Sequence, residues 1–118
     1  MMSYIGKIPH SKVIDLRQDV PLEEDQILSK TLVQRSNLGI TAFALDKDQA
    51  IGRHSSPGDA MVNVLSGTAK ITIDQTDYLV HAGETIVMPA DIPHALFAET
   101  AFQMLLIVVK PEAEETTK

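Results

Sequence analysis

Imidazole side chains are the groups with the widest chemical range in this sequence, which contains four histidines and no cysteine. A histidine can bind a transition metal or transfer a proton near neutral pH. The lack of cysteine excludes disulfides, thiolate nucleophiles and cysteine-based metal sites. His10 lies in an irregular segment and His81 precedes a glycine turn, so both are expected to be solvated. His54 and His94 each belong to a longer pattern.

The pattern that ends at His94 begins with a glycine, Gly83, and contains two prolines. Pro89 is expected to end a strand because it removes a hydrogen-bond donor from the ladder. Asp91 stands where a tight turn needs a residue that tolerates a positive φ. Pro93 keeps the residue before it extended, so His94 should begin the next strand in a defined orientation. Alone, this spacing indicates only a turn between two strands.

A second pattern runs from His54 to Gly67, and together the two patterns resemble the paired motifs of the cupin superfamily. The usual first motif has two histidines one residue apart, a glutamate four residues on and a glycine seven beyond that. Counting back from Gly67 puts the glutamate at Ala60, the second histidine at Ser56 and the first at His54. The second motif matches at its glycine, its proline and His94.

This resemblance implies a metal site that has lost half of its ligands. Cupin metals are typically held by three histidines and a glutamate, and Ser56 and Ala60 occupy two of those four positions. His54 and His94 remain, which predicts at most a weakly bound divalent transition metal such as iron, manganese, nickel or zinc. Asp59 is one residue from the missing glutamate, so on a strand it should point away.

The resemblance, which extends over residues 39–109, implies an all-β fold: a double-stranded β-helix, or jelly-roll barrel, of short antiparallel strands. The sequence also indicates antiparallel strands without the resemblance. Short segments of alternating apolar and polar residues follow one another, and the turns between them leave no room for crossover helices. We expect one domain, with an N-terminal segment and edge strands over 1–36, the barrel core over 37–110, and an acidic, frayed tail over 111–118.

The expected strands are separated by turn-forming residues and cover 27–35, 40–45, 60–65, 69–74, 78–80, 85–88, 94–99 and 104–109. Residues 53–59 are expected to form a turn-rich loop. Residues 21–25 resemble a first helical turn, but we assign the following segment to a strand because it leads through a turn into another strand.

A ligand pocket is expected inside the barrel around the two histidines, lined by Ser56, Ala60, Val62, Met88, Leu96 and Met104. The depleted ligand set favours a protein that binds a small molecule and that is itself weakly loaded with metal or free of it. The alternative is a metal-dependent oxygenase or isomerase acting on a small organic substrate. A metal-free acid–base enzyme is a third hypothesis, and Tyr4 and Tyr78 are its only tyrosine candidates.

The net charge of −6 argues against nucleic acid as a partner. No apolar run is long enough to cross a membrane. Residues 1–16 lack the pattern of a secretory signal, and with the lack of cysteine this favours the cytoplasm. Because a small barrel has sheet edges to cover, we expect a homodimer to which residues 12–16 and the hairpin after Ile27 contribute.

Overall fold

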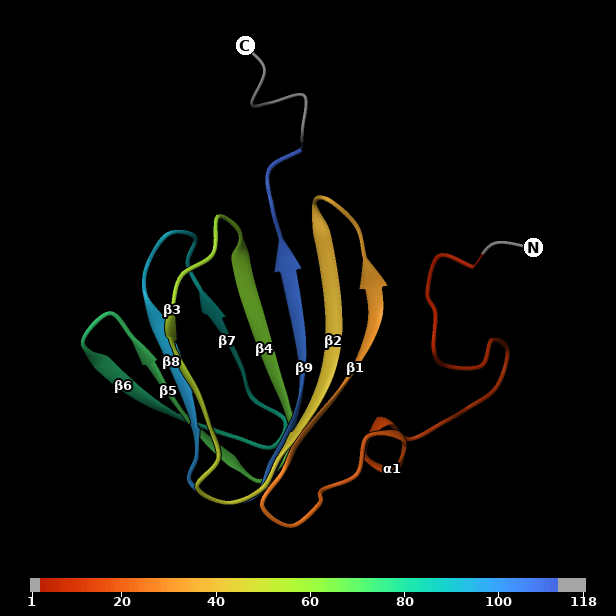
Figure 1. Cartoon of the computed structure of the whole chain (residues 1–118), viewed down its shortest axis with the longest axis horizontal. Coiled ribbons are helices and arrows are strands. Elements are labelled where there is room, and N and C mark those ends of the chain that lie inside the picture. Colours follow the sequence, from red (N-terminus) through yellow and green to blue (C-terminus); the bar gives the residue numbers. More distant parts are fainter. Residues whose placement is uncertain (1–2, 113–118) are drawn as a thin grey trace.

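Two antiparallel β-sheets face each other in the computed structural model, which describes residues 3–112 (Figure 1). The five-stranded sheet has the order β1-β2-β9-β4-β7, and the four-stranded sheet has the order β3-β8-β5-β6. The elements are α1 (Leu16–Asp19), β1 (Ile27–Gln34), β2 (Leu38–Leu45), β3 (Ala50–His54), β4 (Asp59–Ser66), β5 (Thr68–Ile73), β6 (Thr76–His81), β7 (Thr85–Met88), β8 (His94–Ala98) and β9 (Phe102–Val109). The predicted all-β jelly-roll barrel is confirmed.

The alternation of side chains along β4 and β9 separates the inside of the barrel from the outside. Ala60, Val62 and Val64 are buried, whereas Asn63, which points to the opposite face, is only half-buried. On β9, Leu106 pairs with Val62 across the ladder and therefore faces inward as well. The inner faces of the two sheets thus supply the core.

The strands β2 and β9 meet at one end of the barrel, where β2 finishes and β9 begins (Figure 1). Leu45 and Phe102 pair across these two strands, and both are completely buried. At the same end Gly67 has a φ of +74° and leaves no space for a side chain, because an added Cβ would overlap the Ala101 carbonyl oxygen. We call this end of the molecule the closed end.

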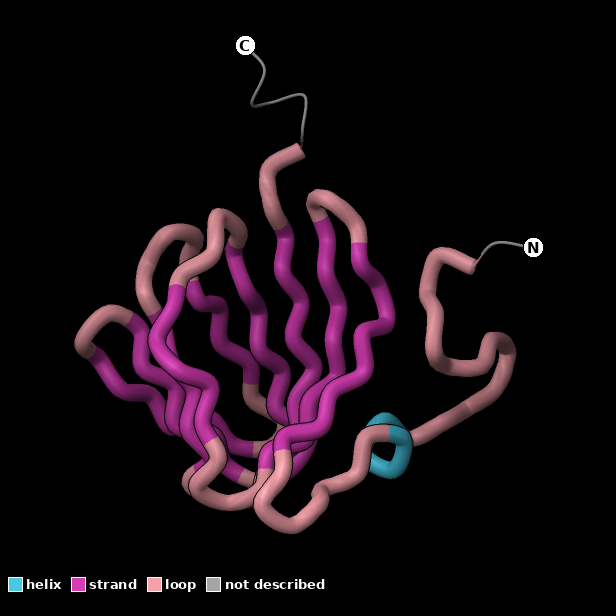
Figure 2. The backbone as a smooth tube through the Cα atoms, in the orientation of Figure 1, coloured by secondary structure: helices cyan, strands magenta, loops and turns pink. Residues whose placement is uncertain are grey.

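At the opposite end, the β1–β2 hairpin, the β3–β4 and β7–β8 loops and the last residues of β9 come together (Figure 2). We call this end the mouth. Within the part of the chain that the structure describes, no helix is long and apolar enough to cross a membrane.

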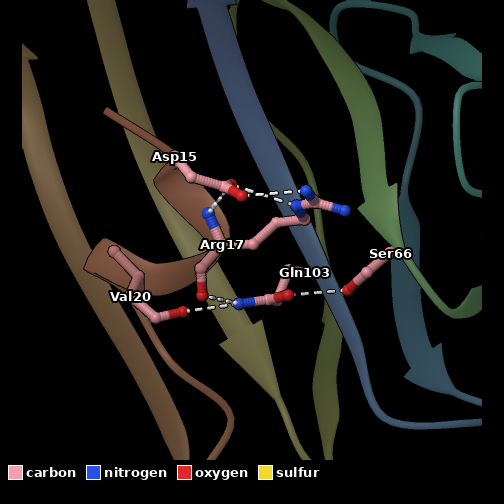
Figure 3. Close-up of polar contacts among 5 residues, drawn as sticks. All are labelled: Asp15, Arg17, Val20, Ser66 and Gln103. Carbon is pink, nitrogen blue, oxygen red and sulfur yellow. Dashed lines mark hydrogen bonds and ion pairs between the residues drawn. The ribbon is translucent and has the colours of Figure 1, made fainter. Parts of the chain in front are cut away.

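The N-terminal segment is attached to the outside of the five-stranded sheet by a buried glutamine, Gln103 (Figure 3). Its amide nitrogen donates to the backbone carbonyls of Arg17 and Val20, at 2.6 and 2.8 Å. Its amide oxygen accepts a hydrogen bond of 2.7 Å from the hydroxyl of Ser66. Because the last carbonyls of a helix lack intrahelical partners, Gln103 caps α1 as well as holding it.

One local expectation was wrong, and one short helix was not predicted, whereas the strand expected over 27–35 is confirmed as β1. Residues 53–59 are not all loop, because Arg53 and His54 belong to β3, a strand that the sequence did not reveal. The only helix in residues 3–112 is α1, not a turn within 21–25. It begins after Asp15, whose carboxylate accepts a hydrogen bond from the backbone N–H of Arg17 as an N-cap. Most of the expected frayed tail, residues 113–118, lies outside the described residues.

Candidate functional site

His54 and His94 are direct neighbours in the four-stranded sheet, at the mouth of the barrel. The two Nε2 atoms are 3.2 Å apart, and the rings meet edge to face with centroids separated by 4.5 Å. The His94 side chain is 2% exposed, whereas His54 is exposed. One imidazole is thus held inside the barrel, and the other lies between it and solvent.

A β-bulge turns His54 toward the inside of the barrel. On β3, His54 lies three residues after Ile51. Their pairing partners on β8, His94 and Leu96, are only two residues apart. On a regular strand an odd separation would place Ile51 and His54 on opposite faces. The extra residue puts both on the inner face, where Ile51 packs against the core.

The backbone assigns the protonated nitrogen of His54. Its Nδ1 lies 2.8 Å from the carbonyl oxygen of Gly52, and a carbonyl can only accept a hydrogen bond, so Nδ1 carries the hydrogen. The Nε2 of the neutral His54 ring is therefore a free lone pair that faces His94. It can accept a hydrogen bond from the Nε2–H of His94, or it can bind a metal.

His94 is left with an unsatisfied nitrogen. Its Nδ1 is buried and has no hydrogen-bond partner among residues 3–112. Burial lowers the pKa of His94, and the charge of a protonated His54 lowers it further, while the carbonyl of Ile92 acts in the opposite direction. His94 is therefore neutral at pH 7, as a metal ligand or a general base must be.

Two hydrogen bonds join the β7–β8 loop, which precedes His94, to the β3–β4 loop and to the first residue of β4. The N–H of Asp91, whose φ of +65° agrees with the prediction, donates to the carbonyl of Ser56 at 2.7 Å. The N–H of Ala90 donates to the carboxylate of Asp59 at 2.8 Å. Asp59 is thus directed at the neighbouring loop, away from the histidines.

The two histidines could supply two ligands to one metal ion. Two nitrogens bound tetrahedrally at 2.0–2.1 Å lie about 3.3 Å apart, close to the separation of the two Nε2 atoms. Within residues 3–112 no group of three or more histidine, cysteine, aspartate or glutamate side chains is placed to hold a metal. The Ser56 hydroxyl accepts a hydrogen bond from the N–H of Gly58.

The six residues predicted to line a pocket divide into two groups. Ser56 lines a cavity of about 200 Å³ at the mouth, together with inward residues of β2 and β9 such as Thr41, Leu106 and Val108. The other five predicted residues lie in the buried core, below this cavity: Ala60, Val62, Met88, Leu96 and Met104.

Sequence reasoning missed several polar and charged residues of the same cavity, including Gln34, Arg35 and Lys110. The pairing of β1 with β2, and of β2 with β9, brings them together. The alternating pattern of β2 was a usable signal, because Gly39 and Thr41 interrupt an otherwise apolar strand on one face.

Comparison with known proteins shows the family to which this chain belongs. A model of the cupin domain family matches residues 42–110, more than half of the chain, so the chain belongs to the cupin family. No match was found among curated proteins. The chain is 70% identical to a conserved protein of unknown function from Streptococcus pyogenes, with a TM-score of 0.94; the match covers 95% of this chain and 98% of that one.

Two further solved structures extend the comparison. A cupin 2 conserved barrel domain protein from Leptotrichia buccalis is 44% identical, with a TM-score of 0.80, over 82% of this chain but only 47% of that chain. A cupin superfamily protein from Desulfitobacterium hafniense is 24% identical, with a TM-score of 0.87, over 92% of this chain and 100% of that chain, which shows the shared fold.

Proposed function

We propose that this chain is a small-molecule-binding cupin barrel in which His54 and His94 recognise a polar group of the ligand. The observation that carries the proposal is the contact between their Nε2 atoms at the mouth. Ser56, two residues after His54, lines the cavity at the same end of the barrel, whereas the two histidines are not among its lining residues. A concave site with apolar walls and a few converging polar groups is the usual form of a ligand pocket. A polar group of the ligand would take the place of His94 as the hydrogen-bond partner of the His54 Nε2 lone pair.

In this proposal a metal is at most weakly bound, since the described residues supply two ligands where tight sites usually have three or four. The second candidate, a metal-dependent oxygenase or isomerase, is favoured by one observation: the two nitrogens have the spacing of ligands on a single ion. A metal held there would supply Lewis acidity to a bound substrate. The buried position of His94 would exclude water from one side.

Metal analysis separates the two candidates. Untagged protein purified without chelators should contain far less than one transition metal per chain. Added nickel or zinc should bind more weakly at about pH 5.5 than at about pH 8, because neutral imidazoles must give up the metal to take protons. A stoichiometric metal that survives dialysis would favour the enzyme and contradict the binding proposal.

Ligand binding itself is tested by a fragment screen in which the imidazole NMR resonances are observed. Hits should shift the signals of His54 and His94, and His54→Gln should weaken those hits. The exposed His81 provides the matched control, as His81→Gln should leave the same hits unchanged. A screen without hits at the histidine pair would overturn the proposal.

We also propose a homodimer that forms through the outer face of the five-stranded sheet. An apolar row crosses all five strands on this face through ladder pairs, and consists of Val33, Ile40, Ile107, Met61 and Val87. Val87 is 49% exposed, so part of the row is open to a second copy. Light scattering should give twice the chain mass of 12.9 kDa, and Val87→Lys should shift the protein toward the monomer.

A further inference from the structure

Two cationic residues, Arg35 and Lys110, are among those that line the cavity at the mouth. Arg35 lies in the β1–β2 hairpin, where its N–H donates to the carbonyl of Leu38 at 2.8 Å. Lys110 follows β9, and its N–H donates to the carbonyl of Asn37 in the same hairpin at 2.9 Å. Backbone hydrogen bonds therefore hold both cations on one side of the cavity.

Neither cation has an acidic partner within the described part of the chain. The ion pairs among residues 3–112 involve other groups, and neither Arg35 nor Lys110 belongs to one. The Arg35 guanidinium carbon lies 5.8 Å from the centroid of the Tyr4 ring, a cation–π contact that restrains its position without neutralising it.

The local charge is opposite to that of the whole molecule. The chain has 16 acidic and 10 basic side chains, yet no aspartate or glutamate lines this cavity. A neighbouring surface hollow, which Lys110 also borders, contains the acidic residues Asp59 and Glu112. Asp59 already accepts a hydrogen bond from the N–H of Ala90.

The remaining lining suits the rest of a small ligand. Gln34, Thr41 and Ser56 provide neutral polar groups, while Leu106 and Val108 provide an apolar wall. The cavity volume of about 200 Å³ is below the roughly 300–1,000 Å³ of pockets for drug-sized ligands. The lining therefore favours a compact ligand that has an apolar body and a charged end.

We propose that the mouth cavity binds the anionic group of such a ligand, a carboxylate or a phosphate, between Arg35 and Lys110. A guanidinium presents paired donors that match both anions, and an ammonium adds a point charge. This inference rests on the proposed small-molecule function and specifies the substrate class: a small organic anion. The anionic end binds to the cations, and the body of the ligand lies against Leu106 and Val108.

The test uses four probes of similar size that differ in charge: benzoate, phenyl phosphate, benzamide and benzylammonium. Binding to the full chain is measured by calorimetry and by the methyl NMR shifts of Leu106 and Val108, with a chelator present so that no anion binds through a metal. Benzoate or phenyl phosphate should bind at least about tenfold more tightly than the other two. The stronger of the two anions identifies the group. In about 1 M salt, where the Debye length is about 3 Å, this preference should largely vanish.

The variant Arg35→Gln with Lys110→Gln should lose about tenfold or more in affinity for the anions and retain the weak binding of benzamide. Its matched control, Lys12→Gln with Lys47→Gln, changes the net charge equally. Lys12 lies in the N-terminal segment and Lys47 in the β2–β3 loop at the closed end, so the control should bind as the parent does.

Three results would overturn the inference: equal binding of benzamide or benzylammonium and the anions, anion binding that persists in the Arg35 and Lys110 double variant, or no binding of any probe. The first leaves small-molecule binding intact, and the second moves the anion site elsewhere. The third is separated from a failure of the proposed function by the fragment screen at His54 and His94, which does not depend on these cations.

Discussion

The two ends of the barrel are built from the same strands but differ in what their inner faces carry. At the closed end, the inward pair of β2 and β9 is Leu45 with Phe102, and both are completely buried. At the mouth, the corresponding inward pairs are Thr41 with Leu106 and Gly39 with Val108, which line a cavity. Toward the mouth the inward residues of β2 change from Leu45 and Phe43 to Thr41 and Gly39. Those of β9 become smaller, from Phe102 to Val108, but stay apolar.

We infer from this difference that the residues of the closed end mainly stabilise the fold, whereas those of the mouth are suited to binding a ligand. Burial of large apolar side chains such as Leu45 and Phe102 at the closed end stabilises the fold. The mouth can therefore carry groups that would be unfavourable in a core, such as the unpartnered Nδ1 of His94 and the cation of Arg35. Changes at the closed end should alter stability, and changes at the mouth should mainly alter binding.

The largest expected effect is at the closed end. Phe102→Ala should lower the free energy of unfolding by about 3–5 kcal/mol, because it removes a fully buried ring and leaves a cavity. Leu106→Ala at the mouth should cost no more than about 2 kcal/mol, the lower end for leucine, since its side chain already borders a cavity. Chemical denaturation measures both, and equal losses would contradict the distinction between the two ends.

Gln103 tests whether the closed end tolerates an unsatisfied polar group. Gln103→Ala should cost about 1–3 kcal/mol, because the carbonyls of Arg17 and Val20 and the hydroxyl of Ser66 lose their partner. Trypsin cleavage after Arg17 should become faster as α1 detaches. Asn63→Ala, which removes an exposed contact to Thr85, is the control and should stay within about 0.5 kcal/mol.

Restoring the two missing ligands tests the alignment of the mouth with the cupin motif. In Ser56→His with Ala60→Glu, the glutamate must fit where a buried methyl group packs, at a cost of about 1–3 kcal/mol without metal. Manganese, nickel or zinc should more than offset this loss, since a hundredfold excess over Kd stabilises by about 2.7 kcal/mol. Melting temperatures with and without metal measure the effect. A variant that responds to metal no more than the parent would show that the motif register is wrong.

The smallest effect is a pH dependence that arises from His94. Because its pKa in the folded protein is below the ordinary value of 6.5, the unfolded chain binds the proton first as the pH falls. The free energy of unfolding should therefore decrease as the pH falls below 6.5, until the pKa of the folded state is passed. His94→Leu should reduce this slope in denaturation curves across that range, and His81→Gln should not. An unchanged slope in His94→Leu would assign the effect to another group.

Local chemistry made much of the fold readable from the sequence. Pro89 ends β7 and Pro93 precedes β8, as the missing donor and the restricted backbone predicted. Asp91 adopts a positive φ, as expected for its place in a tight turn. Each of these features depends on a residue and its immediate neighbours, so no distant part of the chain had to be known.

The features that were missed depend on contacts between distant segments. The strand β3 was hidden because its bulge breaks the alternation of side chains, and only pairing with β8 reveals it. The helix α1 has four residues, too few to form alone, and is held by Gln103 from a strand 83 residues beyond Val20.

For the candidate site, the sequence by itself determined which groups are present: two histidines in cupin-like patterns, with Ser56 and Ala60 in the places of further ligands. The tertiary structure decided how they meet. It set the 3.2 Å contact between His54 and His94, and it brought Arg35 and Lys110 to one cavity. Strand register and loop pairing fix such distances, and both follow from the packing of the whole barrel, which no local pattern encodes.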